Sequence, residues 1–216
     1  MKLIRESLYD TLGFTENGDP VKDMGIGVDK LIKDWLLSHG IHEHQYRLTK
    51  EKFIIGDDTI NLTSMAVEKF PEYIQFAHIN GGFHCPMRGM TSLRGCPRLV
   101  QGSFFCSGNS LKNSGLIGGP QQVTGDYGAS FCGLESLEGI AFKIEEDVYI
   151  NDNNLHSLEF IPKEIGSLYI ISNPIKTLEF FPDVIKGDLH YTASEILNYK
   201  SILKRCKVLG ELRTYN

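Results

Sequence analysis

The 216-residue sequence predicts an α/β repeat solenoid, in which about seven short parallel strands stack between an N-terminal helical cap and a C-terminal helix. Two observations support this prediction. First, "VYINDNNLHSLEF" at residues 148–160 is followed twenty residues later by "LYIISNPIKTLEF" at residues 168–180. Second, the frame L-x-L-x-x-N-x-L, with related apolar residues allowed, recurs from residues 60, 83, 104, 127, 148, 168 and 189. A regular period of this length is the signature of repeat architectures.

Each frame is expected to form a short strand whose residues alternate between its two faces. The apolar first and third positions are expected to point into the core. One repeat cannot bury these residues alone, so neighbouring repeats must stack. The first-position column is Ile60, Phe83, Phe104, Tyr127, Val148, Leu168 and Leu189, and the third-position column is Leu62, Cys85, Cys106, Ala129, Ile150, Ile170 and Tyr191.

The sixth position of the frame predicts a turn. It is asparagine in three copies, at Asn109, Asn153 and Asn173, and an asparagine side chain can bond to the backbone of a tight turn. Less regular turns are expected where this residue is replaced. The replacements are Met65, Arg88, Cys132 and Ser194. Prolines in the return segments exclude a long helix there, and these are Pro97, Pro120, Pro162 and Pro182.

The frame resembles that of leucine-rich repeats. The stretch "FPEYIQFAHINGGFHC" at residues 70–85, followed by "TSLRGCP" at residues 91–97, is similar to the leucine-rich-repeat-like proteins of tailed phages. The stretch "GFTENGDPVKDMGIG" at residues 13–27 resembles the leader that precedes such repeats. This resemblance covers nearly the whole chain, and it implies a fold and a viral origin but no assigned reaction.

The pattern divides the chain into three parts: a leader and helical cap at 1–55, the solenoid at 56–196 and a C-terminal capping helix at 197–216. The cap is expected to contain a helix over 28–40, with Gly40 as its stop. Its apolar face would consist of Val28, Leu31, Ile32, Trp35 and Leu36. At the other end, the residues expected to face the array are Ile196, Leu197, Ile202, Leu203 and Leu209.

Composition narrows the functional classes. The chain has 22 basic and 27 acidic residues and a formal net charge of −5, which argues against general nucleic-acid binding. The first residues lack the apolar core of a signal peptide, and no stretch approaches the roughly 20 apolar residues of a membrane span. We therefore expect no membrane partner and a cytoplasmic location, which is the host cytoplasm if the chain is viral.

Neither a metal nor another cofactor is expected. His39, His42 and His44 lie close together in the sequence, but a metal site needs convergent ligands and usually a fourth one, so a polar connector is the simpler interpretation. The five cysteines include no CxxC pair, which favours reduced thiols. Cys85 and Cys106 share one inward position in adjacent repeats and could approach disulfide distance. Small buried thiols are the favoured alternative.

The outward strand face supplies the candidate site. Between the two inward columns lie Asn61, His84, Phe105, Gly128, Tyr149, Tyr169 and His190, and one residue before the strands lie Ser103, Asp126, Asp147, Ser167 and Asp188. An aromatic stripe bordered by acids is typical of a protein contact. The alternative is that the aromatic rings only stack on one another across strands. The residues expected to bind a protein partner are His84, Phe105, Tyr149, Tyr169, His190, Asp147 and Asp188.

These observations favour a non-enzymatic protein–protein interaction module of phage origin that binds a host or viral protein. The alternative is a virion or assembly component, in which the open ends of the array pack many copies together. An enzyme would need a nucleophile beside a base, and nothing in the sequence places one there. Asp126, Asp147 and His190 do fall near one face of the predicted array.

Overall fold

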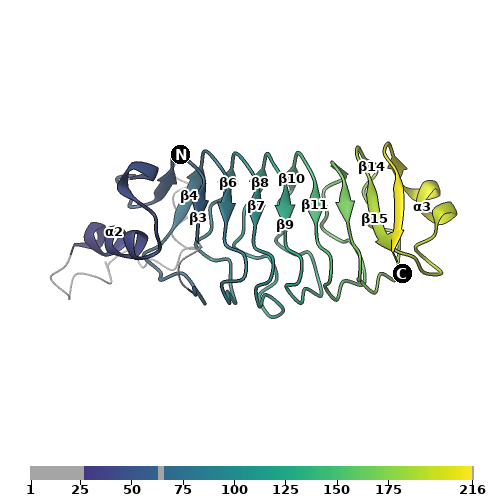
Figure 1. Cartoon of the computed structure of the whole chain (residues 1–216), viewed down its shortest axis with the longest axis horizontal. Helices are drawn as coiled ribbons and strands as arrows, with labels where there is room; N and C mark the ends of the chain where they lie inside the picture. Colours follow the sequence, from purple (N-terminus) through teal and green to yellow (C-terminus); the bar gives the residue numbers. More distant parts are fainter. Residues whose placement is uncertain (1–26, 63–65, 216) are drawn as a thin grey trace, which may run out of the picture.

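The computed structural model describes residues 27–62 and 66–215 and confirms the predicted solenoid. The coils stack along one long axis, with the helix α2 at one end and the helix α3 at the other (Figure 1). Residues 13–26 of the predicted leader lie outside the described residues. Met65, one of the predicted irregular turn positions, lies outside them as well.

One face of the stack is an eight-stranded sheet in which every neighbouring pair is parallel. All seven predicted strands are present and begin at the predicted residues. An eighth strand, β17, follows 23 residues after the start of β15 and extends the sheet. The strands are β3 (Ile60–Asn61), β5 (Phe83–His84), β7 (Phe104–Phe105), β9 (Tyr127–Gly128), β11 (Val148–Tyr149), β13 (Leu168–Tyr169), β15 (Leu189–Thr192) and β17 (Leu212–Tyr215).

The return arm of each coil carries a second short strand, which was not predicted. Five of these strands form one sheet together with the N-terminal strand β1 (Tyr46–Leu48), and they are β2 (Ile54–Gly56), β4 (Phe76–Ile79), β6 (Leu99–Val100), β8 (Gln122–Val123) and β10 (Lys143–Ile144). Three form another: β12 (Glu164–Ile165), β14 (Val184–Ile185) and β16 (Lys207–Val208). The break between them falls at the shortest repeat, where Ile165 precedes the next frame by three residues instead of the four that separate Ile144 from Val148.

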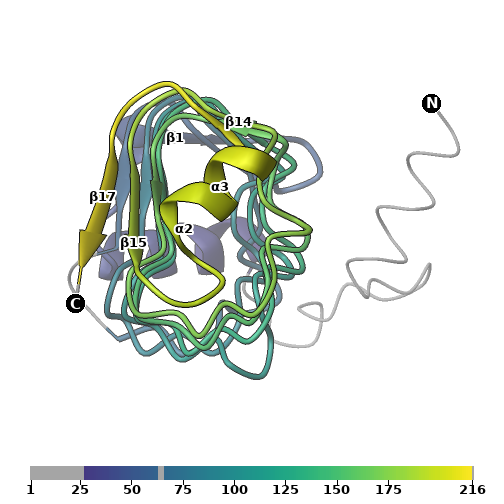
Figure 2. The same cartoon turned by 90° about the vertical axis from the view of Figure 1, so that its right-hand side faces the viewer.

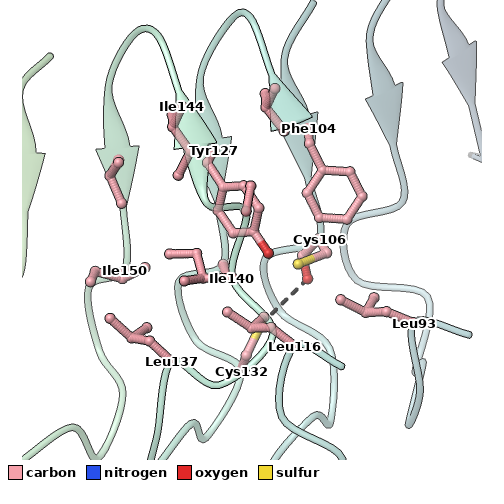
Figure 3. Close-up of a cluster of buried hydrophobic side chains, with 14 of the residues drawn as sticks. Leu93, Phe104, Cys106, Leu116, Tyr127, Cys132, Leu137, Ile140, Ile144 and Ile150 are labelled. Carbon is pink, nitrogen blue, oxygen red and sulfur yellow. Dashed lines mark hydrogen bonds between the residues drawn. The ribbon is translucent and has the colours of Figure 1, made fainter. Parts of the chain in front are cut away.

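The core lies between the two faces of each coil. Every first- and third-position residue of the seven frames is at most 2% exposed, as predicted. The return strands close the core from the other side with Val100, Val123, Ile144, Ile165 and Ile185. Figure 3 shows this packing around Tyr127, whose ring centroid lies 5.3 Å from that of Phe104 in the preceding coil. Burial of two apolar columns by neighbouring coils is the main stabilising contribution in such a fold.

The asparagine positions join neighbouring coils, so their role extends beyond the predicted turn. The side-chain oxygen of Asn109 accepts hydrogen bonds from the backbone N–H groups of Arg88, at 3.0 Å, and Met90, at 2.9 Å, in the preceding coil. Its amide donates to the carbonyls of Cys85 and Cys106, both at 2.8 Å. Asn153 and Asn173 make the same kinds of bond. Each asparagine therefore satisfies buried backbone groups of two coils.

The N-terminal end is covered as predicted. Helix α2 (Val28–Ser38) buries Ile32 and Leu36, and Trp35 meets Phe70 edge to face with ring centroids 5.7 Å apart. A short 3₁₀ turn, η2 (Glu43–Gln45), leads into β1, which pairs antiparallel with β2. The antiparallel strand and the helix together cover the first coil, as a terminal repeat requires.

The C-terminal end differs from the predicted helix over 197–216. Helix α3 spans only Tyr199–Arg205, because Cys206 adopts an extended conformation and the chain then forms β16 and β17. Of the five residues expected to face the array, Leu197 and Ile202 are buried. The other three are exposed, and they are Ile196, Leu203 and Leu209. Figure 2 views the stack from this end, where α3 lies within the outline of the coils.

Candidate functional site on the outward face

The outward face of the eight-stranded sheet carries a column of stacked rings near its C-terminal end. Parallel pairing places Tyr149, Tyr169 and His190 side by side on β11, β13 and β15. The Tyr149 and Tyr169 rings are 4.4 Å apart at 16°, and the Tyr169 and His190 rings are 4.1 Å apart at 18°. Tyr215 continues the column, with its centroid 5.7 Å from that of His190. These four residues are called the aromatic stack below.

Tyr215 was not among the predicted site residues. It is in register with Thr192, yet its ring stacks on His190, and its hydroxyl lies 2.9 Å from His190 Nδ1. The sequence signal was the period itself. A frame starting at residue 212 places Arg213 in the outward column, and Tyr215 lies two residues further on the same face.

Stacking decides which parts of the rings reach solvent. His190 is only 7% exposed, and Tyr149 and Tyr169 are half-buried. Neighbouring rings cover one another's faces, so the stack presents ring edges and tyrosine hydroxyls. The alternative considered from sequence, that the rings stack across strands, therefore describes the geometry of this part of the column.

A second, separate aromatic group lies on β5 and β7. The rings of His84 and Phe105 are 5.2 Å apart, and His84 Nδ1 lies 2.8 Å from Asn61 Oδ1. Gly128 follows in the column, where a Cβ atom would lie 2.3 Å from Cδ1 of Phe105. The Phe105 ring thus covers the glycine, and within the described residues no ring contact joins it to Tyr149. The expected continuous strip is therefore two groups, called the aromatic pair and the aromatic stack.

The bordering row of serines and aspartates has a structural role that the sequence did not suggest. Each member accepts a hydrogen bond from a backbone N–H of the next coil. Asp147 Oδ1 accepts from Ser167 at 2.5 Å, and Asp188 Oδ1 accepts from Glu211 at 2.9 Å. The other members, Ser103, Asp126 and Ser167, do the same at 3.1–3.2 Å. The acids thus hold the coils together as well as bordering the stack.

The charges beside the stack are partly compensated. Asp188 Oδ2 lies 3.1 Å from Arg213 Nη2, and the same guanidinium group lies 3.1 Å from Glu211. Burial lowers the pKa of His190 and Arg213 lowers it further, while Asp188 opposes this in part, so His190 is neutral near pH 7. Burial also raises the pKa of Tyr149, with Asp147 contributing. The Tyr149 hydroxyl donates to Asp147 Oδ2 at 3.4 Å. Asp147 is thus a bordering acid that accepts a hydrogen bond from the stack, while Asp188 Oδ2 lies 3.9 Å from His190 Nε2.

The remaining candidate groups are located as follows. His39 is buried, and its Nδ1 lies 2.7 Å from the carbonyl oxygen of Trp35, while the His42 and His44 rings stack 5.9 Å apart. In residues 27–62 and 66–215, no group of three or more His, Cys, Asp or Glu residues is placed to hold a metal ion. All five cysteines are free and buried, so Cys85 and Cys106 do not form the disulfide considered from sequence.

Comparisons with protein-family models, with curated proteins and with solved structures find no match for this chain. The phage leucine-rich-repeat resemblance therefore stays a prediction. Within the part of the chain that the structure describes, neither helix has the length and apolar character needed to cross a bilayer.

Proposed function

We propose that the protein is a non-enzymatic interaction module that binds a protein partner through the outward face of its eight-stranded sheet. The observation that supports this most is the stacking of Tyr149, Tyr169 and His190 at 4.1–4.4 Å on adjacent strands. Asparagine bonds and the serine–aspartate row fix the strands that carry these rings. A rigid aromatic surface loses little conformational entropy on binding, so more of its contact energy contributes to affinity.

The residues of the outward face would contribute to partner binding in different ways. The half-exposed side chains His84, Phe105, Tyr149 and Tyr169 are proposed to touch the partner. His190 is almost fully covered, and its ring would hold the Tyr169 ring in place by stacking on it from the neighbouring strand. Asp147 and Asp188 give the border a negative character, which favours Lys or Arg on the partner and makes association sensitive to salt. Arg213 reduces this effect at Asp188.

The proposed partner is a host or viral protein, and the proposed location is the cytoplasm of a phage-infected cell. The support for the viral setting is the resemblance of residues 70–97 and 13–27 to phage leucine-rich-repeat-like proteins. General nucleic-acid binding is not proposed, because the net charge of the chain is −5.

A virion or assembly role is the second candidate, and the C-terminal end favours it. Tyr199, Leu203 and Leu209 are exposed there, on helix α3 and just after strand β16. Copies that pack through their ends would cover these side chains. Light scattering of the purified protein separates the two candidates, because an assembly component would form defined oligomers and an interaction module would remain a monomer.

Photo-crosslinking tests the proposed face. A benzoylphenylalanine at Phe105 is expected to crosslink a partner in a lysate of infected cells. The same probe at Phe142, which is 64% exposed but lies on the return arm, is the matched control. Crosslinking from position 142 and none from position 105 would place the binding surface elsewhere.

A further inference from the structure

We propose that the outer edge of β17 binds an extended acidic segment of a partner protein, which pairs with it as a ninth strand. This site is the backbone edge of β17 at the end of the solenoid; it differs from the outward side chains proposed above, although Tyr215 of the same strand ends the aromatic stack. Among the described residues, β17 is the last strand of its sheet, and no strand pairs with its outer side. Natural proteins usually protect such an edge, because its free backbone groups are a template for another strand.

The pairing of β17 with β15 shows that this edge is well formed. The two strands keep parallel register over four residues, from Leu189 with Leu212 to Thr192 with Tyr215. The other six neighbouring pairs of the sheet each pair over only two residues. The last strand thus offers a longer extended edge than the strands inside the stack.

The hydrogen-bond pattern identifies the backbone groups that point outward. In each coil, the N–H groups at the first and third positions donate to the next coil, as Leu168 does to Asp188 and Ile170 does to His190, both at 2.9 Å. Leu189 continues the pattern by donating to Glu211 at 2.8 Å. The equivalent positions of the last strand are Leu212 and Thr214, so their N–H and C=O groups face away from β15.

Exposed apolar side chains lie at this end of the solenoid. Helix α3 lies at the same end of the stack (Figures 1 and 2). The exposed large hydrophobic residues of this end are Ile196, Tyr199, Leu203, Leu209 and Tyr215, with exposed fractions of 37–62%. A terminal coil that faces water carries a polar outer surface, as a capping repeat does. The apolar side chains therefore indicate a surface that a partner covers.

Charge selects the kind of segment. Residues 194–216 contain five basic and two acidic side chains, although the whole chain has a net charge of −5. Arg205 pairs with Asp183, and Arg213 pairs with Asp188 and Glu211. In the described residues, no acid pairs with the remaining three, which are Lys200, Lys204 and Lys207. This free positive charge attracts an acidic segment and opposes a second copy of the same basic end.

A peptide that copies residues 187–196, "GDLHYTASEI", is a suitable probe. Its sequence already forms a strand in this sheet, it carries two acids and it contains no Lys or Arg. We expect saturable binding of the fluorescein-labelled peptide, measured by fluorescence polarisation. A version with both acids changed to lysine should bind about tenfold more weakly, because it meets the basic end with positive charge.

Thr214→Pro is the decisive variant. Proline removes the outward N–H of Thr214 and places its ring on the outer edge, while the pairing with β15 does not use that N–H. Peptide affinity should fall about tenfold or more with little change in melting temperature. Lys200→Glu with Lys204→Glu provides a second test on exposed helix positions, and it should also weaken the acidic peptide.

Three outcomes would overturn the proposal. The first is that the peptide does not bind the unmodified protein. The second is that affinity is unchanged by Thr214→Pro, by Lys200→Glu with Lys204→Glu and by the exchange of the peptide's acids for lysine. The third is a dimer of the protein that Thr214→Pro converts to a monomer. The last would show that a second copy occupies the edge. Tyr149→Ala with Tyr169→Ala should leave peptide binding unchanged, because these residues lie on inner strands. A failure of the proposed β17 edge site can therefore be distinguished from a failure of the proposed binding through the outward face.

Discussion

Asn153 accepts a hydrogen bond from the backbone N–H of Cys132, at 3.0 Å, and Cys132 occupies the same position one coil earlier. The Cys132 side chain cannot repeat the bonds that an asparagine makes there. Its sulfur lies 3.4 Å from the carbonyl oxygens of Cys106 and Ser130, one of the contacts drawn in Figure 3. A thiol is a weak donor, so this coil junction is held less firmly than its neighbours.

Cys132→Asn should restore the regular junction. The amide would donate to the same carbonyls, and each such bond contributes about 1 kcal/mol. The Leu111 N–H of the preceding turn already donates to the Cys132 carbonyl at 3.1 Å and would gain no new bond. We expect the free energy of unfolding to rise by about 1 kcal/mol in denaturant melts. The reverse exchange, Asn153→Cys, should lower it by about 1–3 kcal/mol. A loss of stability in Cys132→Asn would show that the site around Cys106 is too apolar for an amide.

Neighbouring residues of β13 should respond very differently to truncation. Leu168 is fully buried, so Leu168→Ala should cost roughly 2–5 kcal/mol of unfolding free energy. Tyr169 lies outward and loses mainly its contacts with the Tyr149 and His190 rings, so Tyr169→Ala should cost about 1–2 kcal/mol. Equal losses in denaturant melts would contradict the assignment of the two strand faces.

Gly128 should be sensitive to the smallest substitution. In Gly128→Ala, the new Cβ would displace the Phe105 ring and lower the unfolding free energy by about 1–3 kcal/mol. In the background Phe105→Ala, the same substitution should cost at least about 0.5 kcal/mol less, because the clashing ring is absent. Additive losses in the double-mutant cycle would show that the two residues do not interact.

Acid should weaken the fold partly through its outward histidines. Burial lowers the pKa values of His190 and His84 below the ordinary value of 6.5, so below pH 6.5 the unfolded chain binds more protons than the folded one. The stability that depends on the two histidines being neutral is fully present above pH 6.5, and it is lost as the pH falls toward and through their lowered pKa values. His190→Phe keeps a ring in the stack and removes one titrating group. Its melting temperature should therefore fall less than that of the unmodified protein between pH 7.5 and 5.

The sequence predicted the parts of the fold that repeat and missed those that depend on coil contacts. The frame was enough for the seven strands and both buried columns, because strand alternation leaves one way to bury Phe104, Cys106 and their equivalents. Most return strands are only two residues long with one buried residue, such as Val123 in β8, and so gave no alternation to detect. The last strand, β17, begins at the interval that the repeats predict, but too few of its residues match the frame for the sequence to reveal it.

The candidate site was predicted only in outline. Alternation correctly placed Tyr149 and Tyr169 outward. It could not show that the Phe105 ring turns onto Gly128, because side-chain direction depends on the space that a neighbour leaves. Nor could it show that Asp147 bonds to the backbone of the next coil, since an acid at that position is equally consistent with a solvent-facing border.

The most direct test of the proposed outward-face function is partner capture from infected-cell lysate by the variant Tyr149→Ala, Tyr169→Ala. Ile165→Val is the matched control, because it loses about 0.5–1.5 kcal/mol of stability from the core and leaves the outward face unchanged. We expect the double variant to lose capture of a partner that both the unmodified protein and the control retain. Full capture of the same partner by the double variant would contradict a binding role for the aromatic stack.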